Sequence, residues 1–303
     1  MSWSKNDLHD LQISGKIAKL TLDQIETHIK PGISIGTLFD TIVKLIRSTK
    51  GATLAFPPNI SINECAAHDS AAPNEQRVIP KKALVKIDIG ANVNGMLSDT
   101  ARTYSIDGKN NKLIKASKEA LDNAIKIIKP GLRVNEIGAQ VQETIEGYGF
   151  KPVANLTGHQ LERGQLHAGL SIPNVKSMPF AKRGKLKAGM ILAIEPFASN
   201  GKGANAGYVE DAKDRPALIY SSSGNPRTEI GKIIVKRYEK LPFALRSAER
   251  FLTSKKVPFD NLTDILKKDR FHGYRPLIER TGGLVSQAEH TILVTSKGAK
   301  IIT

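Results

Sequence analysis

Apolar residues at helical spacing predict two helices near the start of the chain. The first covers residues 5 to 29 and stops at Pro31-Gly32, a pair that ends helices. The second covers about residues 36 to 49 and carries one apolar face. A loop and strand segment with two prolines follows and ends at His68. The pattern therefore predicts a helix pair placed before strands.

The same succession returns 99 residues later, with a helix at residues 112 to 129 that ends at Pro130-Gly131. Three apolar positions of the earlier helix face coincide at this offset with a later one: Leu38 with Ile137, Ile42 with Val141, and Ile46 with Ile145. The later unit also ends at a histidine, His159. Helix spacing alone recurs by chance, so the strands carry more weight in the comparison.

Acidic residues fall at corresponding places in the strands of both units. IPKKALVKIDIG, with Asp88, matches GKLKAGMILAIEPF, with Glu195, and SDTARTYSI, with Asp99, resembles AEHTILVTS, with Glu289. The repeat predicts an α+β fold in which two helix-helix-hairpin units surround a pseudo-two-fold axis. Each hairpin would offer two carboxylates to a shared centre.

Residues 84 to 104 read as a hairpin that turns near Asn94-Gly95, with one aspartate in each strand. If the turn centres on Val93 and Asn94, Asp88 and Asp99 face each other directly; one residue later they become diagonal neighbours. Two buried like charges that close require a cation between them. An exposed hairpin with solvated acids is the alternative that this stretch alone leaves open.

The acids of the second unit are 94 residues apart, so an insertion separates its strands. We expect a helix in residues 240 to 255, a second in 259 to 271 and an extended hairpin after it, which suggests a winged-helix-like subdomain. The predicted domains are a catalytic first part at 1–212, the inserted helical subdomain at 213–280, and the final catalytic strands at 281–303.

The composition is that of an ordinary globular protein, with 40% hydrophobic and 24% charged residues among 303. No apolar run is long enough to span a membrane and the first residues lack a signal-peptide core, so a cytoplasmic protein is expected. A single cysteine, Cys65, fits a reducing compartment and excludes an intrachain disulfide. The net charge of +16 favours encounter with polyanions, although no nucleic-acid-binding motif accompanies it.

The marked polar residues form a candidate metal site: Asp88, Asp99, His159, Glu195 and Glu289. Four carboxylates and one imidazole suit a pair of divalent ions such as Mn, Fe or Co better than a structural zinc. Two such ions can activate water and polarise a scissile carbonyl, so metal-assisted hydrolysis is predicted.

Two further histidines, His68 and His167, belong to segments that flank this site and could stabilise an oxyanion or hold a substrate amide. A satisfied polar residue is the alternative for each of them. His290 follows a predicted ligand on the opposite strand face and is expected to be structural.

Five motifs in order resemble the methionine aminopeptidases of the pita-bread fold: NISINECAAH, KIDIGANVNGMLSDTA, NLTGHQLERGQLHAG, AIEPF and QAEHTIL. The long insertion before Glu289 is similar to the type 2 enzymes, and the absence of an extension or zinc module resembles their archaeal form. The resemblance covers nearly the whole chain. Two departures are Pro196, which resembles type 1, and SNGKGANAGYVED, where an expected pocket histidine is missing.

The resemblance implies a role for each site residue. Asp88 resembles the terminal ligand of one metal, Asp99 and Glu289 the bridging carboxylates, and His159 and Glu195 the ligands that complete the second metal site. His68 looks like the reactive histidine of the family and His167 like the histidine that contacts the substrate. The positions expected to line the methionine pocket are Phe56, Leu166 and Tyr274.

The implied activity is removal of the initiator methionine from nascent proteins whose second residue is small. Two divalent ions (Co, Mn, Fe or Zn) would activate a hydroxide that attacks the methionyl carbonyl. The implied partners are nascent polypeptide N-termini and, through the basic surface, a transient ribosome contact; a monomer without membrane or specific nucleic-acid binding is expected.

Two other functional hypotheses remain open at this point. A Xaa-Pro dipeptidase resembles this fold and ligand set, although those enzymes usually carry an extra N-terminal domain. A catalytically inactive relative that binds RNA or the ribosome is the second, in which the insertion lysines would matter: Lys255, Lys256, Lys267 and Lys268. All five metal positions are filled here, whereas inactive relatives lose such ligands.

Overall fold

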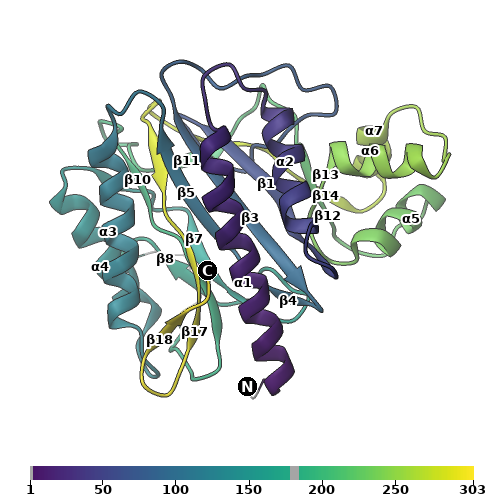
Figure 1. Ribbon diagram of the computed structural model, residues 1–303. Helices are drawn as coiled ribbons and strands as arrows, with labels where there is room; N and C mark the ends of the chain where they lie inside the picture. The colour runs from purple at the N-terminus through teal and green to yellow at the C-terminus, as the bar shows by residue number, and fades with distance from the viewer. Residues whose placement is uncertain (1–2, 178–183) are drawn as a thin grey trace.

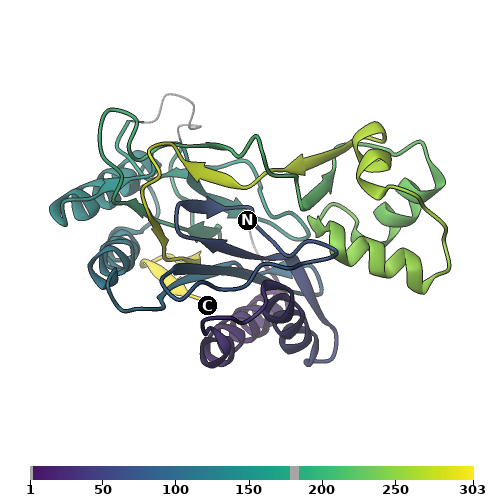
Figure 2. The ribbon, with the colours of Figure 1, turned by 90° about the horizontal axis from the view of Figure 1, so that it is seen from above.

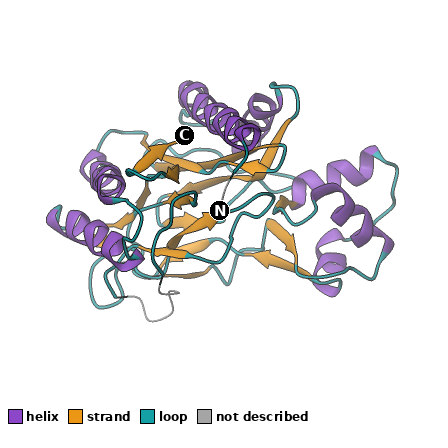
Figure 3. Cartoon of the chain, turned by 90° about the horizontal axis from the view of Figure 1, so that it is seen from below, coloured by secondary structure: helices purple, strands orange, loops and turns teal. Residues whose placement is uncertain are grey.

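Strands occupy the middle of the molecule and helices its outside in the computed structural model, which describes residues 3–177 and 184–303 (Figure 3). One helix pair covers the strands on one side and a second pair on another, while three further helices form a group at one end (Figures 1 and 2). The two helix pairs belong to the two units of the repeat, so the predicted pseudo-symmetry is visible in the arrangement.

The first unit begins with a helix whose start the sequence defines well. Ser4 caps it by accepting from the Asp7 backbone N–H, and the Asp7 carboxylate accepts in return from the Ser4 N–H. The elements of this unit are α1 (Lys5–Ile25), a 3-10 turn (Glu26–His28), α2 (Ile35–Arg47), β1 (Ala52–Ile62), β2 (Cys65–Ala67), β3 (Leu84–Val93), β4 (Met96–Leu97) and β5 (Thr100–Ser105). The predicted face of α2, including Leu38 and Ile42, is fully buried in the core that this helix forms with β1 and β3.

The second unit repeats this plan with α3 (Asn111–Ile127), α4 (Val134–Gly147), β6 (Lys151–Pro152), β7 (Thr157–Leu161), β8 (Ser171–Pro173), β9 (Ile191–Ile194) and β10 (Phe197–Ser199). Helix α4 starts 99 residues after α2, at the offset that the apolar pattern predicts. The final strands are β16 (Val285–Gln287), β17 (His290–Val294) and β18 (Ala299–Ile301). The predicted repeat of helices and strands is therefore confirmed.

The register of the first hairpin selects one of the two arrangements left open by the sequence. Asp88 on β3 pairs with Ala101 on β5, and Val93 pairs with Met96, so the turn centres on Asn94-Gly95. Asp88 and Asp99 are diagonal neighbours, and direct opposition of the two is wrong. Asn94 and Gly95 both adopt positive φ, which explains why the turn sits on them rather than one residue earlier.

One backbone bridge joins the two halves at the acidic positions. The Glu289 N–H donates to the Ala101 carbonyl, which ties the start of β5 to the residue just before β17. Strand β17 continues into a five-stranded sheet of order β18-β17-β9-β7-β8, in which His290 pairs with Ile194 and His159 with Ala193. Asp88, Ala101 and Glu289 thus lie in one line across the two sheets, and Glu195 follows Ile194, the partner of His290. Asp99 and His159 are displaced from this line, because Asp99 lies two residues before Ala101 and His159 pairs with Ala193, two residues before Glu195.

Strand β11 (Val209–Asp211) comes just before the insertion, which contains β12 (Ile219–Ser222), α5 (Glu229–Tyr238), β13 (Phe243–Ala244), α6 (Leu245–Ser254), α7 (Leu262–Lys268), β14 (Phe271–Tyr274) and β15 (Leu277–Glu279). Its three helices pack with a small sheet of order β13-β12-β14 around a separate apolar cluster. Three helices and a three-stranded sheet thus pack together in this region, and its description as a winged-helix-like subdomain stays a prediction.

Two details of the insertion differ from the prediction. Helix α5 was not expected, because it lies outside the two segments whose apolar spacing was considered. The expected hairpin is wrong as well: β14 pairs with β12, whereas β15 pairs with β11 and β2, since the chain leaves the small sheet after Tyr274 and returns to the main body. The division at residues 212 and 280 stays a prediction, and residues 1–2 and 178–183 of the first part lie outside the described residues.

None of the helices in the described part of the chain is both long and apolar enough to cross a membrane.

Two glycines of α4 allow a matched test of its packing. A Cβ at Gly138 would lie 2.3 Å from the carbonyl oxygen of Val175, whereas a Cβ at Gly147 meets nothing within 4 Å. We expect Gly138→Ala to lower the free energy of unfolding by about 1 to 3 kcal/mol because the helix must move away from its neighbour. Gly147→Ala should leave it unchanged or raise it by up to about 1 kcal/mol. Urea titration followed by circular dichroism measures both, and equal effects would contradict this packing.

Candidate metal centre and catalytic cavity

All ten residues singled out from the sequence line one cavity of about 120 Å³. They are Phe56, His68, Asp88, Asp99, His159, Leu166, His167, Glu195, Tyr274 and Glu289. They come from both units of the repeat and, through Tyr274, from the insertion. The structure therefore brings together every predicted site residue; the role of each stays a prediction.

Carboxylates and one imidazole meet at the floor of the cavity. The His159 Nε2 lies 3.3 Å from an Asp99 carboxylate oxygen and 3.6 Å from a Glu195 oxygen. One ligand atom from each of Asp99, His159 and Glu289 lies within 4.8 Å of the others. All three of these residues are buried, so the group has the spacing and the enclosure of a metal site.

Three buried polar atoms of residues that line this cavity have no hydrogen-bond partner in the described part of the chain, which is unusual for buried groups. They are Oδ1 of Asp88, Nδ1 of His159 and Oδ1 of Asn59. The other Asp88 oxygen accepts a long hydrogen bond of 3.4 Å from the side-chain amide of Gln287, which also donates to Glu289 at 3.5 Å. Gln287 is not among the site residues predicted from the sequence. Its place two residues before Glu289, on the same strand face, was the signal available.

The electrostatics of the four carboxylates are unfavourable without a cation. Among the described residues, no lysine or arginine forms an ion pair with Asp88, Asp99, Glu195 or Glu289. Burial raises the pKa of Asp99 to about 7, and burial together with the neighbouring carboxylates raises the pKa of the other three well above their usual range. Burial lowers the pKa of His159 to about 4, which keeps its nitrogen available as a ligand. The donor set thus fits divalent cations.

His68 is held in a backbone conformation that few residues adopt. Its φ is 62°, in the left-handed region where a side chain costs conformational energy. The next residue, Asp69, is buried and binds Arg77 through both carboxylate oxygens at 2.9 Å and also Arg215. These ion pairs fix the backbone at His68, whose ring meets that of Tyr274 edge-on at a centroid distance of 5.4 Å.

His167 lies beside the metal-site histidine. Its ring and that of His159 meet edge-on at a centroid distance of 4.3 Å. His167 is solvent-exposed on the cavity side, yet the surrounding protein and then the His159 ring lower its pKa. Burial also lowers the pKa of His68 to about 4, and the charge of His167 contributes to this shift. Both imidazoles are therefore neutral at neutral pH and can each donate one hydrogen bond to a substrate.

The upper wall of the cavity is largely apolar. Phe56 and Leu166 are buried there, and Leu156, Phe197 and Ile219 line the same space without having been predicted. The segment at residues 199–210, where a pocket histidine was expected, contributes none of the lining among the described residues. An apolar slot therefore stands next to the polar floor, with Ile219 and Tyr274 closing the wall that the sequence left undefined.

Two residues set aside in the sequence analysis have structural roles. His290 lies outside this lining, and its Nδ1 is 2.9 Å from the hydroxyl of Thr303. Cys65 is buried, and burial raises the pKa of its thiol to about 11. A thiol with so high a pKa is a poor nucleophile, which agrees with its expected role as a small buried residue.

Comparison with known proteins agrees with the motifs. Residues 9–296 match the model of metallopeptidase family M24. The chain is 38% identical over 296 residues to a methionine aminopeptidase of Thermococcus onnurineus, across 96% of this chain and 97% of that protein. The predicted resemblance to archaeal methionine aminopeptidases is thereby confirmed.

Solved structures share the fold over almost the whole chain. A thermophilic Arx1 superposes with a TM-score of 0.82 at 15% identity, covering 99% of this chain and 91% of that one. A methionine aminopeptidase of Thermotoga maritima superposes with a TM-score of 0.71 at 23% identity, covering 99% and 98%. At these identities the likeness shows the fold alone, which is the predicted pita-bread fold. Taken with the family match and the sequence relatives, it shows that this chain belongs to metallopeptidase family M24.

Proposed function

We propose that this protein removes methionine from the amino terminus of polypeptides by metal-dependent hydrolysis, with preference for a small second residue. The observation that carries the proposal is the cavity in which four carboxylates and His159 lie beside an apolar slot. Sequence relatives that span nearly the full chain and are methionine aminopeptidases support the same activity. The small cavity of about 120 Å³ favours a small residue after the methionine.

The five polar side chains would hold two divalent cations. Asp88, Asp99 and Glu289 supply oxygen ligands on one side, and His159 and Glu195 complete the set on the other. Four carboxylates neutralise two dications, and the partnerless Asp88 oxygen is accounted for if it is a ligand. Mn, Fe, Co and Zn all accept this mixture of oxygen and nitrogen. When bound, such ions activate water and polarise the scissile carbonyl.

The remaining cavity residues orient the substrate. Phe56, Leu166 and Tyr274 form the wall against which an unbranched thioether side chain packs. His167 and His68 are neutral donors, so each can direct an N–H at the carbonyl or amide of the bound peptide without adding a charge. Both histidines lie near the metal-site residues, so they are placed to stabilise the carbonyl oxygen on which negative charge develops during the reaction.

The cellular setting belongs to the same proposal. Nascent chains are the polypeptides whose amino termini carry methionine, and the net charge of +16 favours encounter with the polyanionic ribosome. A cytoplasmic monomer that contacts the ribosome only transiently fits these properties.

Release of free methionine from Met-Ala-Ser tests the proposed reaction. Chelator-treated protein should be inactive, and adding Mn, Co, Fe or Zn in turn should restore activity with at least one ion. The N-acetylated peptide should resist cleavage, because the reaction needs a free amino terminus. Cleavage of Ala-Pro but not Met-Ala-Ser would indicate a Xaa-Pro dipeptidase instead. Folded protein that is inactive with every ion would contradict the enzyme proposal.

Substitution of two neighbouring histidines separates metal binding from turnover. We expect His159→Ala to weaken metal binding by about 10- to 100-fold or more and to abolish nearly all activity. His167→Ala should retain the metal and lose about 100-fold or more in kcat, since it removes a donor to the developing charge. Calorimetric metal titration and peptide kinetics measure the two effects. His28→Ala, an exposed histidine far from the cavity, is the control, and near-wild-type rates in both variants would refute the site.

The pH dependence of stability tests the repulsion within the cavity. The pKa of Asp99 rises from 3.8 to about 7 on folding, so its neutral form is the one the fold favours. Its stabilising contribution is full below about pH 4 and is lost as pH rises to about 7. In chelator-treated protein, the fall in the free energy of unfolding from pH 4 to pH 8 should therefore be smaller in Asp99→Asn than in wild type, by about 2 to 4 kcal/mol.

The exposed Asp260→Asn serves as the control for that measurement, because it changes the same type of group on the surface. Saturating divalent metal should remove or reverse the fall in wild type, because bound cations favour the ionised carboxylates. An identical pH dependence in wild type and Asp99→Asn without metal would show that the carboxylates do not repel one another as described.

A further inference from the structure

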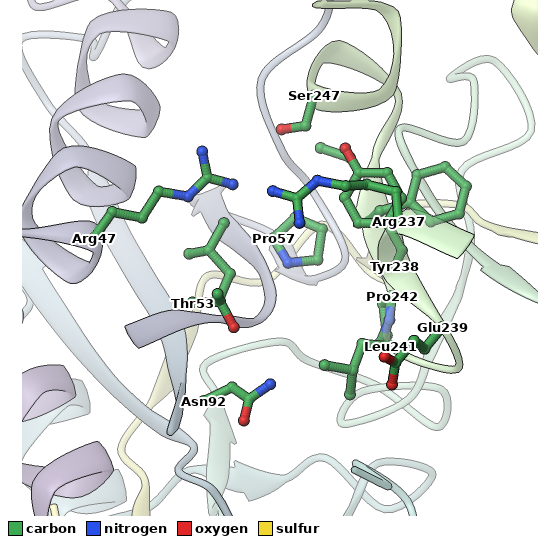
Figure 4. Close-up of a pocket in the computed structure, with 13 residues that line it drawn as sticks. Arg47, Thr53, Pro57, Asn92, Arg237, Tyr238, Glu239, Leu241, Pro242 and Ser247 are labelled. Carbon is green, nitrogen blue, oxygen red and sulfur yellow. The ribbon is translucent and has the colours of Figure 1, made fainter. Parts of the chain in front are cut away.

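A second cavity, of about 210 Å³, lies where the insertion meets the main body (Figure 4). Arg47, the last residue of α2, and Arg237, in the last turn of α5, extend toward each other across it (Figure 4). Neither guanidinium has an ion pair with an acidic group among the described residues. Arg47 is exposed at the rim of the cavity, and partial desolvation and then the charge of Arg237 lower its pKa, which agrees with two like charges that face each other.

Elsewhere in the same interface, arginines form ion pairs with an acidic residue. Asp40 lies two helical turns before Arg47 on the same face of α2, and its carboxylate binds both Arg246 and Arg250 of α6 at 2.8 and 2.6 Å. At one end of the interface, Asp40 therefore neutralises the arginines of α6. At the other end Arg47 faces Arg237, and no acidic side chain among the described residues pairs with either of them.

Aromatic contacts hold Arg237 in place. The Arg237 guanidinium carbon lies 5.7 Å from the ring centroids of both Tyr238 and Phe251. Stacking on aromatic faces fixes its plane while its edges stay available for hydrogen bonds.

One acid lines this cavity, but it lies away from the two arginines. Glu239 stands at the opposite end, and its carboxylate points away from the guanidinium groups (Figure 4). It forms no ion pair with either of them. The end formed by Arg47 and Arg237 is therefore the positively charged end, and it suits a planar carboxylate that two arginines can hold together.

This cavity adjoins the catalytic one. Pro57 and Pro242 line both cavities, one from the main body and one from the insertion. A polypeptide whose amino terminus lies in the catalytic cavity must leave it as an extended chain, and the space beyond these prolines contains the two arginines. Continuity with the catalytic cavity favours a part of the substrate over a separate ligand.

We propose that Arg47 and Arg237 bind the side-chain carboxylate of an aspartate or glutamate located a few residues after the amino-terminal methionine of the substrate. This inference rests on the proposed function, since it assigns a preference among polypeptide substrates. The residues that contact the methionine would select the amino terminus, and the arginine pair would favour acidic sequences downstream of it.

Paired peptides test this preference. Hexapeptide amides that begin Met-Ala are prepared with one glutamate at the third, fourth, fifth or sixth position, each matched with glutamine at the same position. The measured quantity is the ratio of kcat/KM for the glutamate and the glutamine peptide. Wild-type protein should give a ratio of about 3 to 10 at one or two positions, the gain expected of a partly solvated charged hydrogen bond. In Arg47→Gln and Arg237→Gln the ratio should fall to about 1 to 2.

The control substitutions make the same charge change outside the cavity. Lys44→Gln on α2 and Lys236→Gln on α5 remove exposed lysines that do not line it, and both should keep the wild-type ratio. Arg47→Lys keeps the charge but loses the planar fork, so its ratio should lie between those of wild type and Arg47→Gln.

Each outcome can be told apart from failure of the proposed function. If no glutamine peptide releases methionine, the proposed function fails. If the glutamine peptides are cleaved but the ratio is near 1 at every position, or survives both arginine substitutions, this inference is overturned. Competitive inhibition by a single-stranded RNA decamer that requires Arg47 and Arg237, with no glutamate preference, would also overturn it by assigning the cavity to a nucleic-acid phosphate.

Discussion

Repulsion among four carboxylates is the constraint on which the rest of this structure depends. Asp88, Asp99, Glu195 and Glu289 lie in one cavity, and no lysine or arginine pairs with them among the described residues. A chain free to relax would separate such charges or expose them to water. Here they stay together because each is attached to a strand that is paired on both sides or capped by a bridge. Strand pairing and the hydrophobic core therefore offset the free energy cost of holding the four carboxylates together.

The pseudo-two-fold repeat explains how one fold supplies these charges. Helices α1 and α2 bury one face of the first sheet, and α3 and α4 do the same for the strands of the second unit. The bridge between Ala101 and Glu289 joins the two units at the acids themselves. Lys86, fully buried on the same strand face as Asp88, donates to the carbonyls of Asn63 and Val285 and so ties β3 to the start of β16.

Most of the catalytic cavity could be predicted because its residues stand in local motifs. Carboxylates in apolar strands, histidines at strand ends and a repeat of fixed offset are visible without coordinates, and all ten predicted residues line one cavity. The sequence does not decide between a turn centred on Val93-Asn94 and one centred on Asn94-Gly95, since both arrangements satisfy the same alternation of side chains along the strands. The left-handed backbone of His68 was equally hidden, because ion pairs from Asp69 to distant arginines enforce it.

The insertion shows the other limit of prediction from sequence. Strands β14 and β15 are close in the chain and look like a hairpin, but tertiary pairing sends them to different sheets. Arg47 and Arg237 are 190 residues apart, and no motif marks either of them. Their relation depends on how the insertion docks on α2, which the Asp40 ion pairs fix. Features made by packing between distant segments thus required the structure.

Anomalous X-ray scattering from crystals grown with Mn²⁺ tests most directly whether divalent cations offset the repulsion of the buried carboxylates. Anomalous peaks are expected within reach of Asp88, Asp99, His159, Glu195 and Glu289, and they should disappear from chelator-treated crystals. Crystals that contain Mn²⁺ but show no peak at this cluster, with the five side chains arranged as described, would contradict this role of the cations.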